Sequence, residues 1–166
     1  APKFPPSMSL DFLMQVAHRD NDEQLREIIV TTLIGMNRLG LATDDIDMVC
    51  VSHLHGDHFG GLPWLLVDAL YVSNRSRPLI VTGPKGIEAR FLTAAETLYP
   101  NITTTKRGFA LSFVEYEERV ALEAGGVTVV PFEVKHPSGA PPYALRFEID
   151  GAVLAFTGDT GSGSFE

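Results

Sequence analysis

One stretch constrains the fold of this chain more than any other: an apolar run, residues 48–51, leads directly into a cluster of histidine and aspartate side chains. The stretch contains, in order, His53, His55, Asp57, His58, Gly60 and Gly61. Successive side chains of a strand point to opposite faces, so His53 and His55 project to the same side if the strand ends near residue 52. Their imidazoles can then converge on one cation.

The adjacent pair Asp57 and His58 cannot share one direction in an extended chain. These residues suit a tight turn that presents both to a second cation, and the cations of two-metal hydrolases lie about 3.5–4 Å apart. Imidazole and carboxylate ligands together favour zinc, with Mn²⁺ or iron as alternatives and calcium or magnesium disfavoured. The sequence therefore predicts one or two Zn²⁺ ions per chain.

The hexapeptide His53-Leu54-His55-Gly56-Asp57-His58 resembles the His-x-His-x-Asp-His mark of the metallo-β-lactamase superfamily. Its continuation, residues 59–63, is most similar to the ribonuclease Z-like phosphodiesterase branch. The resemblance extends over residues 31–160 and implies an α/β (α+β) fold, the metallo-β-lactamase-like αββα sandwich, here incomplete.

The resemblance also implies roles for two later residues. His136 follows a predicted strand where the family has the third ligand of the first metal, and Asp159 matches the Gly-Asp-Thr whose carboxylate bridges both metals. The implied ligands of the first metal are His53, His55, His136 and Asp159, and those of the second are Asp57, His58 and Asp159. Separately, the loop residues Ser138 and Gly139 are candidates for donating hydrogen bonds to a substrate oxygen.

The composition fits one globular domain of 166 residues with a net charge of −8. This negative charge disfavours a general nucleic-acid binder, because phosphate recognition depends on Lys and Arg. No apolar run approaches the roughly 20 residues of a membrane helix, and the sequence shows no basic region followed by an apolar signal core. We therefore expect a soluble, cytoplasmic protein without a membrane partner.

The pattern of predicted elements changes along the chain. Residues 22–39 have apolar side chains at helical spacing, although the β-branched cluster 28–32 also allows a strand followed by a shorter helix. Helices at 61–72 and 86–98 flank a strand at 78–82, which is an α/β alternation. Closely spaced strands follow, at 112–116, 120–124, 127–135, 143–149 and 153–157. Asp150-Gly151 is a strong hairpin signal between the last two.

We divide the chain into an atypical N-terminal segment (1–30), a metallo-β-lactamase-like domain (31–160) and a linker-like tail (161–166). No histidine follows His136, whereas the family contributes a last histidine to the second metal, so we expect weaker binding there. A sandwich lacking part of its cover exposes apolar surface and strand edges. We therefore expect a homo-oligomer or a partner fragment.

These features predict a metallo-hydrolase that uses a metal-activated hydroxide on phosphodiester substrates, with Asp57 orienting the nucleophile. One alternative is the hydrolysis of small molecules such as lactones or thioesters. Another is a truncated or engineered metal-binding scaffold that assembles with another chain and does not turn over. Specific tRNA binding is not supported, because residues 124–156 contain no long basic Gly/Pro-rich arm.

Overall fold

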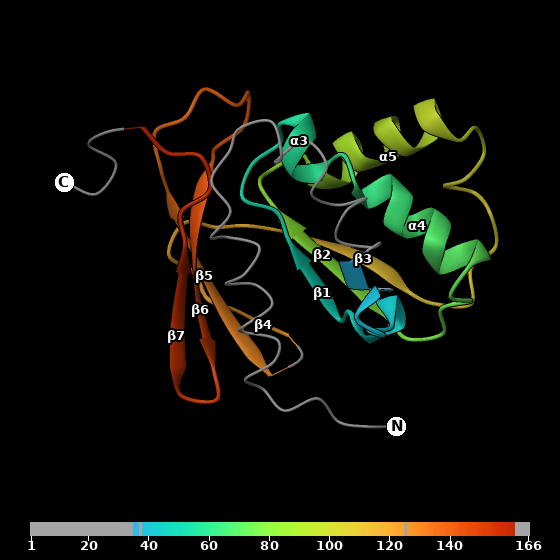
Figure 1. Ribbon diagram of the computed structural model, residues 1–166. Helices are drawn as coiled ribbons and strands as arrows, with labels where there is room; N and C mark the ends of the chain where they lie inside the picture. The colour runs from blue at the N-terminus through green and yellow to red at the C-terminus, as the bar shows by residue number, and fades with distance from the viewer. Residues whose placement is uncertain (1–34, 37, 125, 162–166) are drawn as a thin grey trace.

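The computed structural model describes residues 35–36, 38–124 and 126–161. Their elements, in chain order, are η2 Thr43–Asp45, β1 Met48–Cys50, α3 Gly56–Phe59, α4 Leu62–Tyr71, β2 Leu79–Gly83, α5 Ile87–Leu98, β3 Leu111–Glu115, β4 Leu122–Ala124, β5 Val127–Glu133, β6 Tyr143–Ile149 and β7 Ala152–Phe156. Figure 1 shows three layers: α4 and α5 cover one side of the β1–β3 sheet, and the β4–β7 sheet lies on the other side.

The first sheet is parallel, in the order β1-β2-β3. Both of its faces are covered, which explains why β1 and β2 are almost continuously apolar in sequence. The carboxyl ends of parallel strands lie at the same edge of a sheet, and the chain enters α3 and then α4 from the end of β1. The histidine motif is therefore placed at this edge.

The two long helices pack on the sheet through apolar stripes. α4 buries Leu62, Leu65 and Ala69, and Pro63 occupies its first turn, where a missing amide hydrogen has no cost. α5 buries Ile87, Phe91 and Ala95 at four-residue spacing.

The second sheet is an antiparallel meander, in the order β4-β5-β6-β7. Asp150 and Gly151, which join β6 to β7, have φ angles of 50° and 81°. Positive φ at both central residues is what a type I′ turn requires, so the predicted hairpin is confirmed.

The two sheets pack face to face through a small cluster that includes Tyr116, Val129, Tyr143 and Leu145. At the end of β1 the sheets are joined directly, because the Tyr143 backbone N–H donates to the Ser52 carbonyl at 2.9 Å. This bond brings the start of β6 against the segment that carries the first histidines.

Most predicted elements are present, with shifts of one or two residues at their ends. β1 ends at Cys50 and not near residue 52, and β4 begins at Leu122 because Arg119, with a φ of 61°, sits in a turn before it. The predictions for residues 1–34, including the helix or strand within 22–34, lie outside the described residues. Within the described residues 35–36, 38–124 and 126–161, no helix is both long and apolar enough to cross a bilayer.

Candidate metal centre

The first two histidines lie on an extended loop after β1. The Val51 backbone N–H donates to the Thr82 carbonyl at 2.8 Å, and the Ser52 carbonyl accepts from Tyr143, so the loop is held between the two sheets. His53 is completely buried and His55 is half-buried. Although the strand ends earlier than predicted, both imidazoles reach the same point.

Asp57 and His58 lie on the single turn of helix α3, whose N-cap is His55. Gly60 ends this turn and donates its N–H to the Gly56 carbonyl at 2.8 Å. A Cβ on Gly60 would overlap the Gly56 carbonyl oxygen, so glycine at this position permits the close approach of the two backbone segments. The tight turn expected for the pair is thus a short helix.

The other two candidate ligands come from the second sheet. His136 follows β5, and Asp159 follows β7. Their segments are joined by a hydrogen bond of 2.7 Å from the Gly161 N–H to the Lys135 carbonyl. This contact keeps the chain after β7 beside the end of β5.

Four side chains converge: His53, His55, His136 and Asp159 have ligand atoms within 4.8 Å of one another. His55 Nδ1 is 3.2 Å from His53 Nε2 and 3.1 Å from His136 Nε2. A neutral imidazole nitrogen has one in-plane site, either a hydrogen or a lone pair, so His55 Nδ1 cannot form both contacts as good hydrogen bonds. Ligand nitrogens about 2.0–2.1 Å from a tetrahedral zinc ion lie about 3.3 Å apart, so the donor set fits a shared cation.

Asp159 links this group to the α3 residues. Its Oδ2 lies 3.9 Å from His53 Nε2 and 3.7 Å from His136 Nε2, while its Oδ1 lies 3.5 Å from His58 Nε2. His58 Nε2 is in turn 3.8 Å from Asp57 Oδ2. The carboxylate therefore faces both predicted ligand sets, as a bridging ligand would.

Burial gives His53 the protonation state that a ligand needs. Desolvation, followed by the electrostatic effect of the neighbouring His58, lowers the pKa of His53 to about 4, against an opposing effect of Asp159. The imidazole is therefore neutral at pH 7 and has a lone pair available for a cation.

Ser138 and Gly139 lie in the loop between β5 and β6. The Ser138 hydroxyl donates to the Ala140 carbonyl at 2.6 Å, which engages its hydrogen within the loop, and Gly139 has a φ of 74°. Their contact with a substrate stays a prediction.

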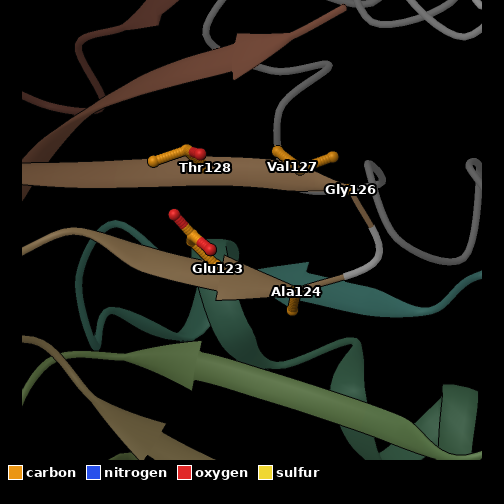
Figure 2. A pocket seen from close by; sticks show the side chains of 5 residues that line it. All are labelled: Glu123, Ala124, Gly126, Val127 and Thr128. Carbon is orange, nitrogen blue, oxygen red and sulfur yellow. The ribbon is translucent and has the colours of Figure 1, made fainter.

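A surface hollow of about 330 Å³ lies elsewhere, at the β4–β5 hairpin (Figure 2). Figure 2 shows the Glu123 carboxylate pointing toward β5, where Thr128 is its cross-strand partner. His136 follows the opposite end of β5, so this hollow is not part of the metal centre.

Sequence reasoning missed one residue beside the ligands. The Ser52 hydroxyl lies 3.2 Å from His53 Nδ1 and is buried with it. A serine directly before a predicted ligand was the available signal, but the hydroxyl has a role only if the side chain turns back toward the imidazole, which sequence spacing does not show.

A family model described as anti-Pycsar protein Apyc1 matches residues 18–164. Ribonuclease Z of Agathobacter rectalis is 32% identical over 121 residues, covering 72% of this chain and 38% of that protein. Ribonuclease Z of Staphylococcus saprophyticus is 29% identical over 103 residues, covering 62% of this chain and 31% of that protein. The chain thus spans about a third of the length of these curated relatives.

Solved structures share the fold at low sequence identity. The short form of human tRNase Z has a TM-score of 0.56 and 23% identity, covering 77% of this chain and 54% of that one. Unliganded yeast PDE1 has a TM-score of 0.55 and 19% identity, covering 71% and 35%. The MIM-2 metallo-β-lactamase has a TM-score of 0.50 and 15% identity, covering 81% and 49%. The predicted metallo-β-lactamase-like fold is confirmed.

Proposed function

This chain belongs to the family of the anti-Pycsar protein Apyc1, and on that premise we propose that it is a metal-dependent phosphodiesterase acting on cyclic nucleotides. The observation that carries the proposal is the convergence of three imidazoles and one carboxylate within 4.8 Å. The ribonuclease Z relatives support a phosphodiester substrate, because their name describes cleavage of that bond.

Two sets of residues would hold cations. The first is His53, His55 and His136 with Asp159, and the second is Asp57 and His58 with the same Asp159. The donor types fit zinc, with Mn²⁺ or iron as alternatives. When bound, the metal would supply Lewis-acid chemistry, lowering the pKa of a water molecule and offsetting the charge that develops on the phosphate.

The protein's own groups would orient the reactants. Asp57 has a half-exposed carboxylate whose Oδ2 lies 3.8 Å from His58 Nε2, so its oxygens are accessible from solvent while its position is fixed by α3. In our proposal Asp57 accepts a hydrogen bond from the attacking water and holds it in line with the phosphorus. His53 is completely buried, so its side of the cluster is closed to solvent.

A substrate panel tests the proposal. We expect the zinc- or manganese-loaded protein to convert a 3′,5′-cyclic nucleotide to its monophosphate and to hydrolyse bis-p-nitrophenyl phosphate, and to be inactive toward lactones and thioesters. Asp57→Asn should lower the rate by about 10²-fold. Asp150→Asn, in the β6–β7 turn, is the matched control and should leave it unchanged.

Three results would argue against the proposal. Turnover of lactones alone would favour the small-molecule hydrolase. A loaded protein that is folded and contains metal, yet hydrolyses no panel member, would favour a metal-binding scaffold. An Asp57→Asn variant with native turnover would remove Asp57 from the mechanism.

A further inference from the structure

We propose that Ser52 and Gly158 position two ligands of the metal centre. The Ser52 hydroxyl orients the His53 ring, and the absence of a side chain at Gly158 allows the segment that carries Asp159 to pack against Ser52. The inference rests on the proposed metal site and not on the proposed substrate. It concerns two residues that are not ligands themselves.

The Ser52 side chain is in position to fix the orientation of the His53 ring. His53 presents Nε2 to the other candidate ligands, and its opposite nitrogen, Nδ1, lies 3.2 Å from Ser52 Oγ. A ligating Nε2 must carry a lone pair, so the proton of the neutral ring sits on Nδ1 and is donated to Ser52 Oγ. This partner sets both the tautomer and the rotation of the ring.

Ser52 is itself held rigidly. It is buried, its carbonyl accepts the Tyr143 N–H at 2.9 Å, and the preceding Val51 N–H is bonded to Thr82. A hydroxyl on a backbone fixed to both sheets loses little further freedom when it binds the imidazole, so the hydrogen bond can act on ring orientation.

Gly158 connects the same serine to the other ligand segment. It precedes Asp159 and has a φ of 57°, and a Cβ there would lie 3.0 Å from both Cβ and Oγ of Ser52. That distance is too short for an ordinary contact, so a side chain at 158 must displace Ser52, the 158–159 backbone, or both. One residue pair thus controls His53 and Asp159 together.

The first experiment measures zinc affinity of the folded protein by competition with a chromophoric chelator. We expect Ser52→Ala to raise the Kd by about 10- to 100-fold, the usual effect of removing a group that supports a ligand. Ser112→Ala, at an exposed serine on β3, is the control and should remain within about twofold of the original protein. A Ser52→Ala Kd within twofold of the original would overturn the role of the hydroxyl.

A spectroscopic readout separates positioning from simple stability. In the zinc-loaded protein, long-range ¹H–¹⁵N correlation spectra should show a slowly exchanging His53 Nδ1–H, which Ser52→Ala should shift and expose to fast exchange. Because Ser52→Ala also removes a buried hydrogen bond, its metal-free unfolding free energy should fall by more than that of Ser112→Ala, and zinc affinities are compared in samples that are fully folded. An unchanged Nδ1–H signal would contradict the proposal.

The second experiment uses two glycines with similar backbones. Gly158→Ala and Gly151→Ala both place a side chain at positive φ, but the space around Gly151 is open. Gly158→Ala should therefore lose at least about tenfold more zinc affinity than Gly151→Ala, and equal losses would refute the contact. If the original protein binds zinc but hydrolyses no cyclic nucleotide, the proposed function fails while both comparisons remain valid.

Discussion

Asp159 presents one carboxylate oxygen to His53 and His136 and the other to His58. Removing it would leave the Asp57 and His58 side with two protein ligands, which is too few for a stable zinc site. We expect Asp159→Ala to lose the second metal, keep most of the first, and lower any phosphodiesterase rate by at least about 10²-fold. Elemental analysis and kinetics on the same sample check this. Two retained metals with near-normal turnover would mean that Asp159 is only a turn residue.

At the residue scale, the sequence predicted the candidate ligands and missed their support. His53, His55, Asp57 and His58 are close in sequence and share a recognisable spacing, while the family resemblance pointed to His136 and Asp159 as further candidates. Ser52 and Gly158 are about a hundred positions apart in the sequence, yet the Gly158 backbone packs closely against the Ser52 side chain. No local periodicity encodes such an approach, so it could only be seen in three dimensions.

Among the connections between elements, the segment after α4 is tied to the loop before β1 by one buried arginine. Arg75 donates to the carbonyls of Thr43, Ile46, Arg77 and Pro78, and its NH1 lies 3.7 Å from Asp44 Oδ1. Neighbouring Arg77 forms ion pairs of its own with Asp45 and Asp47, but these are largely exposed.

This contrast gives a stability prediction. Arg75→Ala leaves the buried Thr43 carbonyl and three partly buried carbonyls without this donor, and should lower the free energy of unfolding by about 3 kcal/mol. Arg77→Ala removes only exposed pairs and should cost less than about 1 kcal/mol. Urea denaturation of both metal-free variants decides the matter, and equal losses would show that Arg75 is no more important than a surface arginine.

At the element scale, turn chemistry and apolar periodicity predicted most of the fold. Asp150-Gly151 located a hairpin because so few residue pairs tolerate positive φ twice, and Pro63 marked the start of α4. The end of β1 was less predictable, because the apolar run continues through Val51 while the strand and its pairing with β2 end at Cys50. Arg75 gave no signal at all, since a single arginine in a polar loop usually lies at the surface.

The stability of the whole metal-free protein should depend on pH through His53. Its pKa is lowered by burial to about 4, from an ordinary value of about 6.5 in the unfolded chain. The unfolded state therefore binds the proton first as pH falls, so this contribution is fully present above pH 6.5 and is lost between about pH 6.5 and 4. We expect a loss of up to about 3 kcal/mol across that window.

Denaturant unfolding of metal-free samples at several pH values measures this effect. His53→Gln removes the titrating group, so its unfolding free energy should vary less over the same window. Parallel pH curves for the two proteins would show that His53 is not the responsible group.

The homo-oligomer or partner fragment expected from the sequence stays a prediction, which light scattering over a range of concentrations can test.

The sequence separation of the candidate ligands bears on how the chain folds. His55 and His136, whose ring nitrogens lie 3.1 Å apart, are separated by 81 positions along the chain. Closing so long a loop lowers the conformational entropy of the chain, and the favourable free energy of docking the two sheets offsets this loss. Before that step, a metal ion meets only the short histidine motif after β1. We therefore expect tight coordination to form late in folding, and a bound metal to act mainly by slowing the separation of the two docked sheets.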